Sequence, residues 1–222
     1  MLRQIKTKSV VSTLIIINVI MFFLQIILGN NFTNLLMLNP NLILKNPLYL
    51  FQIFTSMFMH GGFNHLFWNM YGLLMFGQLL ENKIGWERFL LVYMTAGIFA
   101  GFGHIVLSMF LFGSAPPALG ASGAIMGMLG TLIILMPDLR LLFFFFIPTN
   151  LRTAGIIWIL MDLFGVFIPN GVGNIAHLVG IATGLIFGLY LKQNYRQFNK
   201  KFSKKFHITI EDANDYMKNG RI

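Results

Sequence analysis

Six long apolar segments dominate this chain and limit the folds that it can adopt. They cover roughly residues 10–28, 57–80, 89–111, 122–136, 151–168 and 173–191. An α-helix needs about 20 predominantly apolar residues to cross the hydrocarbon core of a bilayer. The fourth segment is shorter, because Gly120 precedes it and Pro137 ends it. The segments predict an all-α membrane protein in which six transmembrane helices form a bundle.

The composition supports a membrane-embedded fold. Hydrophobic residues make up 56% of the chain and charged residues only 10%, whereas soluble domains carry about 25% charged residues. The 22 glycines suit close contacts between membrane helices. The chain has no cysteine, which excludes disulfides and thiol chemistry. The first apolar segment is too long for a cleaved signal peptide, and no small-residue cleavage site follows it, so we expect it to remain as a helix.

Basic residues gather in the segments that would face one side of a membrane. They precede the first apolar segment, separate the second from the third and the fourth from the fifth, and follow the sixth. These residues are Arg3, Lys6, Lys8, Lys83, Arg88, Arg140, Arg152, Lys192, Arg196, Lys200, Lys201, Lys204 and Lys205. The opposite loops contain one basic residue, Lys45. By the positive-inside rule, both termini are expected in the cytoplasm.

This topology divides the chain into a cytoplasmic N-terminus (1–9), a membrane domain (10–192) and a basic cytoplasmic tail (193–222). We expect the tail to lie against anionic lipid headgroups. The net charge of +9 then reflects orientation in the membrane and not nucleic-acid binding. The external loop from Gly29 to about Tyr49 carries little charge, which favours partial embedding in the outer leaflet.

Four polar residues from three helices are expected at one depth below the outer membrane surface. Ser122 opens the fourth segment, which runs inward and is too short to span the core of about 30 Å. His177 lies near the outer end of the sixth segment, and His65 and Asn69 lie near the outer end of the second. Polar groups inside membrane helices are costly and tend to be functional. Their shared depth predicts a site.

The spacing of the glycines would bring the serine and the histidine together. One face of the sixth helix contains His177, Gly180 and Gly184, and the fourth helix has a matching small-residue face of Gly123 and Gly127. Two such faces allow the backbones of two membrane helices to approach closely. The sequence therefore predicts a hydrogen bond between Ser122 and His177.

A serine beside a histidine can act as a nucleophile. Histidine is the usual base near neutral pH, and the negative oxygen that forms on the attacked carbonyl needs hydrogen-bond donors. The backbone N–H of Ser122, the Asn69 amide and the His65 imidazole are candidate donors. Because no acidic residue occurs in the second, fourth or sixth segment, we expect a Ser–His dyad. Asp162, in the fifth segment, is not expected to orient His177.

Three motifs resemble those of the rhomboid intramembrane serine proteases, over about Leu48–Leu191. HGGFNHLFWN (His60–Asn69) is similar to the family's HxxxxHxxxN, GASG (Gly120–Gly123) resembles its GxSG, and AHLVGIATG (Ala176–Gly184) is similar to its AHxxGxxxG. The resemblance implies a rhomboid-like six-helix bundle with Ser122 as nucleophile and His177 as base. It places His65, Asn69 and the Ser122 amide around the oxyanion.

The resemblance also implies supporting roles and shows two departures. His60 would be structural or hold solvent, and Glu81 would brace helix ends at the cytoplasmic side. Met126 stands where many bacterial members carry an aromatic residue that stacks on the catalytic histidine. The family's Trp-Arg pair, which braces the external loop, is replaced by Phe51 and Gln52.

These features imply an intramembrane serine endopeptidase that needs no cofactor and no metal. Its partners would be single-pass or polytopic membrane proteins, cut near the outer face of the bilayer, and the lipid bilayer itself, with no nucleic acid. The expected location is the bacterial cytoplasmic membrane, as a multi-pass protein.

Other interpretations use the same residues. A rhomboid-like pseudoprotease would bind membrane helices without cleavage, but its mark is loss of the serine or histidine. Ser122 alone could serve helix packing, and His65 and Asn69 could form only an interhelical pair. A transporter would favour an inverted repeat, which the sequence lacks. A metal site built from histidines, with His104 among them, is disfavoured because there is no HExxH motif. The sequence assigns no partner to His104.

Cysteine accessibility tests the predicted topology, because the chain has no cysteine of its own. We expect Lys45→Cys to react with a membrane-impermeant maleimide added outside intact cells. Lys83→Cys, the matched control, should react only after the membrane is permeabilised. Labelling at position 45 from the cytoplasmic side alone would contradict both the topology and the shared depth of the site.

Overall fold

The computed structural model describes residues 9–143, 146–168, 171 and 173–202. The expected N-terminal segment before Ser9 and the basic tail beyond Phe202 lie outside the described residues. The helical elements, in chain order, are α1 (Val10–Leu36), α2 (Pro40–Lys45), η1 (Pro47–Phe51), α3 (Gln52–Thr55), η2 (Ser56–Phe58), α4 (Phe63–Gly72), η3 (Leu73–Gly77), α5 (Gln78–Ile84), α6 (Trp86–Phe112), α7 (Ser122–Leu135), α8 (Leu151–Phe167) and α9 (Asn174–Phe202). Strands β1 (Arg140–Phe143) and β2 (Ile147–Asn150) form an antiparallel hairpin.

The expected segments match helices, with errors at several ends. The third, fourth and fifth are correct within three residues, as α6, α7 and α8. The second was wrong at both ends. Its helix begins at Phe63, because Gly61 and Gly62 interrupt the backbone, and it continues through α4, η3 and α5 to Ile84. Gly85, with a φ of 84°, then ends it.

Helix α1 is longer than the first expected segment, because it continues beyond a break. Gly29 has a φ of 73°, which a glycine adopts without the steric cost of a side chain. The helix resumes after this residue and ends at Leu36. Helix α9 likewise extends past residue 191, to Phe202. The β1–β2 hairpin was not predicted from the sequence.

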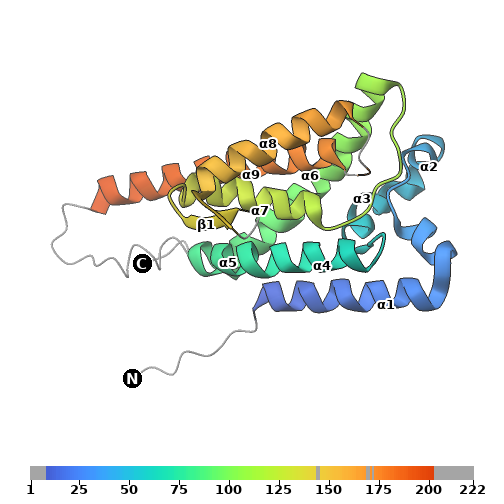
Figure 1. Cartoon of the computed structure of the whole chain (residues 1–222), viewed down its shortest axis with the longest axis horizontal. Coiled ribbons are helices and arrows are strands. Elements are labelled where there is room, and N and C mark those ends of the chain that lie inside the picture. The colour runs from blue at the N-terminus through green and yellow to red at the C-terminus, as the bar shows by residue number, and fades with distance from the viewer. Residues whose placement is uncertain (1–8, 144–145, 169–170, 172, 203–222) are drawn as a thin grey trace.

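Helix α7 lies in the interior of the bundle. It packs mainly against α9 and α6, and it also contacts α4, η3, α5 and α8 (Figure 1). Nearly all of its residues from Gly123 to Leu132 are buried, in keeping with a helix that is apolar on every face. Its first residue, Ser122, is half-buried, directly before the buried part of the helix.

The outer surface of the bundle is apolar. Large hydrophobic side chains are exposed along α1, α6 and α8, with Phe110 at 83% and Phe164 at 70%. Among the described helices, three are long and apolar enough to cross a membrane: Val10–Leu36, Trp86–Phe112 and Asn174–Tyr195. Exposed apolar area on this scale is unfavourable in water and favourable in lipid. The fold is that of a helical membrane protein, and the count of six crossings stays a prediction.

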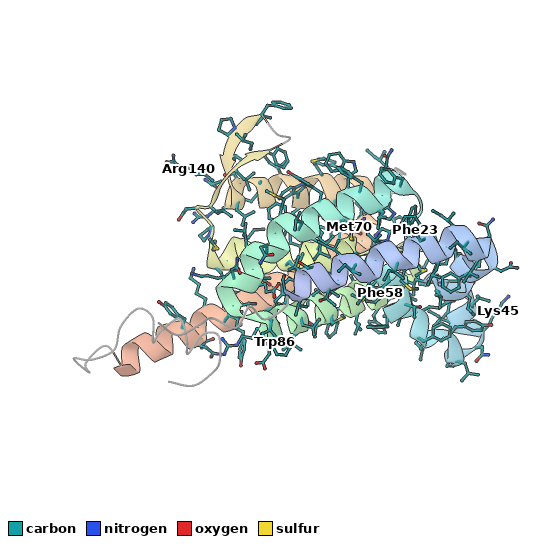
Figure 2. All side chains as sticks on the ribbon, turned by 90° about the horizontal axis from the view of Figure 1, so that it is seen from below. Phe23, Lys45, Phe58, Met70, Trp86 and Arg140 are labelled. Atoms are coloured by element: carbon teal, nitrogen blue, oxygen red, sulfur yellow. The ribbon has the colours of Figure 1, made fainter. Side chains whose placement is uncertain are left out.

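The two ends of the bundle differ in the segments that they carry. The start of α1 and the far end of α9 lie at one end, and α2 and α3 lie at the other (Figure 1). Lys45 and Arg140 also lie at opposite ends (Figure 2). This arrangement separates Lys45 from the other described basic residues in the way that the charge pattern requires. Which end faces the cytoplasm stays a prediction.

Glu81 joins α5 to the beginning of α1. Its carboxylate accepts hydrogen bonds from the Ser9 hydroxyl at 2.8 Å and from the backbone N–H groups of Val10 and Val11 at 2.9 and 3.1 Å. The first N–H groups of a helix have no partner within the helix, and a negative charge there also suits the helix dipole. Glu81 therefore braces two helix ends, the role expected for it.

Glu81→Ala should lower the stability of the protein, because it leaves buried N–H groups of α1 without an acceptor. The expected loss is about 1–3 kcal/mol, measured by thermal unfolding in one detergent. The matched control is Glu87→Ala, since Glu87 is exposed in the first turn of α6. Equal unfolding temperatures for the two variants would contradict the capping role.

Candidate active site

Ser122 is the first residue of α7, and the chain enters the helix through a glycine with positive φ. Gly120 has a φ of 120°, and its N–H donates to the Ser56 carbonyl oxygen at 2.9 Å. A side chain at position 120 would lie 2.8 Å from Nε2 of His65, so the position needs glycine for space as well as for conformation. Because Ser122 begins the helix, its backbone N–H has no partner in the preceding turn.

The segment that leads to Ser122 is fixed at two further points. His104 on α6 contacts the Pro116 carbonyl oxygen through Nε2 at 2.8 Å. Leu38 and Ala118 exchange two backbone hydrogen bonds, each 2.9 Å long. These contacts satisfy backbone groups that no helix or sheet satisfies, and they hold the approach to the serine in place. The Pro116 carbonyl oxygen is thus a partner of His104, which the sequence did not predict.

His177 lies in the first turn of α9 and contacts an acid on the neighbouring helix. Its Nδ1 is 3.1 Å from Oδ1 of Asp162 on α8. The two side chains are only 13% and 10% exposed. The expectation that Asp162 does not orient His177 was therefore wrong in its geometry: the acid missing from the second, fourth and sixth segments is supplied by the fifth.

Glycine contacts bring the helices of Ser122 and His177 together. A Cβ on Gly180 would lie 3.0 Å from the carbonyl carbon of Gly123, and one on Gly184 would lie 2.7 Å from that of Gly127. Thr131 donates a hydrogen bond to the carbonyl oxygens of both Gly127 and Gly184, at 3.0 Å each. The backbones of α7 and α9 are in direct contact, as the two glycine faces predicted.

The immediate neighbours of the serine and the histidine lie close together. A Cβ built on Gly123 would lie 3.7 Å from the Ala176 carbonyl oxygen. Between the described side chains of Ser122 and His177 no hydrogen bond forms. Such bonds are often long in the free state of an enzyme and tighten with substrate. The expected Ser–His bond stays a prediction.

His65 and Asn69 lie on consecutive turns of α4 and face the same site. The His65 ring interacts electrostatically with His177, and a Cβ on Gly120 would touch both this ring and, at 3.9 Å, Oγ of Ser122. The Asn69 side-chain amide donates to the His65 carbonyl oxygen at 2.8 Å. Asn69 is buried, and its Oδ1 has no hydrogen-bond partner in the described structure. The imidazole of His65 is thus close to Ser122, and the place of the Asn69 amide at the site stays a prediction.

His60 precedes α4 and supports His65. The two rings meet edge to face, with their centres 5.2 Å apart. Gln25 on α1 fixes the backbone of His60 on both sides: its Oε1 accepts from the His60 N–H at 2.9 Å, and its Nε2 donates to the His60 carbonyl oxygen at 3.2 Å. Gln25 was not among the predicted site residues, although a polar residue within an apolar membrane segment indicates a functional or structural role.

Comparison with known proteins gives the family of this arrangement. The Rhomboid domain matches residues 47–194, which include all four site residues. The chain belongs to the rhomboid family.

Relatives in plants, bacteria and mammals share part of their length with this rhomboid protein. RHOMBOID-like protein 1 of Arabidopsis thaliana is 34% identical over 154 residues, covering 68% of this chain and 37% of the relative. The rhomboid protease GluP of Bacillus subtilis (strain 168) is 33% identical over 133 residues, 60% of this chain and 24% of that one. The mitochondrial presenilin-associated rhomboid-like protein of Mus musculus is 34% identical over 139 residues, which cover 61% of this chain and 36% of the relative. The chain thus spans less than half the length of these relatives.

Gln52, one of the two residues at the expected Trp-Arg position, braces the loop between α1 and α3 in this rhomboid protein. It is fully buried, accepts the Asn39 N–H at 3.0 Å and donates to the Leu35 carbonyl oxygen at 2.9 Å. One side chain therefore ties α3 to the end of α1 and to the start of α2. Phe51, by contrast, is exposed.

Metal ligation has no candidate in the described part of the chain. No group of three or more His, Cys, Asp or Glu side chains there is arranged to hold an ion. His60 and His65 contact each other through their rings, and the acid Asp162 is engaged with His177. The arrangement instead offers a hydroxyl, a base and hydrogen-bond donors, which are the groups required for nucleophilic attack on a carbonyl.

Gly184→Ala should separate α7 from α9, because the new methyl group would collide with the Gly127 backbone. Overpacking of this kind costs about 1–3 kcal/mol, seen as a lower unfolding temperature. The matched control is Gly72→Ala, whose Cβ would lie at 3.4 Å from Ile125, an ordinary contact distance. A Gly184→Ala variant as stable as Gly72→Ala would show that the two backbones are not held together at this point.

Proposed function

We propose that this rhomboid protein is an intramembrane serine endopeptidase that cleaves membrane proteins near the outer face of the bilayer. The observation that carries the proposal is the position of His177: its helix lies backbone to backbone against the helix that Ser122 begins. The proposal includes six membrane crossings with both termini in the cytoplasm. In a bacterium the site would then open toward the outside of the cytoplasmic membrane.

In the proposed reaction, His177 takes the proton of the Ser122 hydroxyl as Oγ attacks the scissile carbonyl carbon. The proton then passes to the leaving amine, and an acyl-enzyme on Ser122 remains. His177 next takes a proton from water as the water oxygen attacks the ester carbonyl, and it returns that proton to Oγ of Ser122 when the bond to Oγ breaks and the acid product leaves. The free N–H of Ser122 at the helix N-terminus, the buried Asn69 amide and the His65 imidazole are the proposed donors to the oxyanion.

The substrates would be single-pass or polytopic membrane proteins. A peptide bond inside a helix is shielded by its own hydrogen bonds, so a segment that unwinds readily is the best candidate. The apolar exterior of α8 and α4 suits approach from the lipid, with Phe164 and Phe63 among the most exposed side chains. The name of GluP, a rhomboid protease, supports the same class of activity in this chain.

A pseudoprotease that only binds membrane helices is the second candidate. It needs neither the serine nor the histidine, yet both are present, and His177 contacts a buried acid, Asp162, at 3.1 Å. A histidine oriented by a buried acid brings no advantage to binding alone. The geometry therefore favours catalysis.

Substitution of the two central residues tests the activity. Ser122→Ala and His177→Ala should each abolish cleavage of a panel of tagged transmembrane substrates, and the double variant should be no worse, because the groups act as a unit. Asn69→Ala should retain activity reduced about 10²–10³-fold, since one oxyanion donor of several is lost. Rates are measured in liposomes with folded variants.

The matched control is Ser108→Ala, because Ser108 is a buried serine of α6 outside the site. It should cleave at the wild-type rate. Cleavage that survives in Ser122→Ala would end the serine-protease proposal, and a wild-type protein that binds the substrates without cutting any would favour the pseudoprotease.

A further inference from the structure

Asp162 is a buried acid in the outer part of α8. The residue is 7% exposed, and its carboxylate contacts Nδ1 of His177 on α9 at 3.1 Å. The other described acids are used elsewhere: Glu81 caps α1, Asp138 pairs with Arg152 at the surface, and Glu87 is exposed. A carboxylate inside a membrane protein is costly unless it is paired, so its placement beside the proposed base requires a physical reason.

We propose that Asp162 is a positioning residue for His177, so that the site works as a Ser122–His177–Asp162 triad and not as a dyad. The inference rests on the proposed function, because it concerns the same site. An ionised carboxylate offers only acceptors, so Nδ1 of His177 must hold a proton to make the contact. Neutral His177 then has an unprotonated Nε2, the nitrogen that can accept the Ser122 proton.

The contact acts in both states of the base. Before attack it selects one tautomer and one ring orientation. When Oγ of Ser122 bonds to the substrate carbon, its proton moves to Nε2, and His177 becomes a cation with both nitrogens protonated. Asp162 stays ionised and faces that cation, which favours the charged state; no proton moves to the carboxylate. The other titratable ring that faces His177 is His65, on α4, which offers no negative charge.

A purely structural role for Asp162 would be to tie α8 to α9. The two roles differ in which substitution they tolerate. Asn is nearly the same size as Asp and can still make a hydrogen bond, so a structural tie tolerates Asn better than the longer Glu. A positioning acid requires the charge, so Glu should work better than Asn, whose amide can donate to Nδ1 and stabilise the wrong tautomer.

The experiment measures the rate at which a fluorophosphonate probe labels the full-length protein. Labelling joins Oγ of Ser122 to phosphorus, releases fluoride and transfers the serine proton to His177, so the rate reports the base without any chosen substrate. Asp162→Asn should label at least about 100-fold more slowly than wild type, and Asp162→Glu should recover part of that loss. Asp138→Asn is the matched control at an exposed acid and should label at the wild-type rate.

Nitrogen-15 spectra of histidine-labelled wild-type protein provide a second test that needs no variant of Asp162 to fold. The His177 signals are assigned because they disappear in His177→Ala. They should show protonation at Nδ1 when His177 is neutral. A neutral His177 protonated at Nε2 would overturn the inference, and so would wild-type labelling of a folded Asp162→Asn. Labelling that persists in the Ser122→Ala variant would instead overturn the proposed function, so the two failures are distinguishable.

Discussion

Direct contact between the backbones of α7 and α9 is the constraint on which the rest of this structure depends. In lipid there is little hydrophobic force between helices, so close packing and hydrogen bonds must hold them. Gly180 faces Gly123, Gly184 faces Gly127, and Thr131 bonds to the carbonyl oxygens of the second pair. A larger residue at these positions would move His177 away from Ser122, which makes the same glycines responsible for both the fold and the site.

A short central helix creates a second requirement, which the loop before it must meet. The non-helical backbone directly ahead of Ser122 is partly buried, from Ala118 to Ala121, and unpaired polar groups there are costly. Contacts with Ser56, His104 and Leu38 satisfy this segment. They come from three separate parts of the chain, so the serine is held by the whole bundle instead of by its own loop. That rigidity is the precondition for aligned nucleophilic attack.

The sequence predicted those features that are written in local patterns. Apolar length predicted the helices, glycine spacing predicted the α7–α9 contact, and the expected common depth predicted that His65 lies near Ser122. It failed where a tertiary contact decides, as in the bonds of Gln25 to His60 and of Gln52 to Leu35. The contact of Asp162 with His177 could have been predicted. Its helix runs opposite to α7, so a residue near its C-terminal end reaches the depth at which α7 begins.

The two buried acids of the described bundle show how one chemical group serves two purposes. Glu81 accepts three hydrogen bonds from the first residues of α1, so its charge is used in joining helices. Asp162 lies toward the C-terminal end of α8, and its partner is an ionisable ring. A partner that can itself gain a proton makes the interaction stronger in the charged state of His177 than in the neutral one. Only such a difference between two states can assist a reaction, which is why this acid, and not Glu81, belongs to the proposed chemistry.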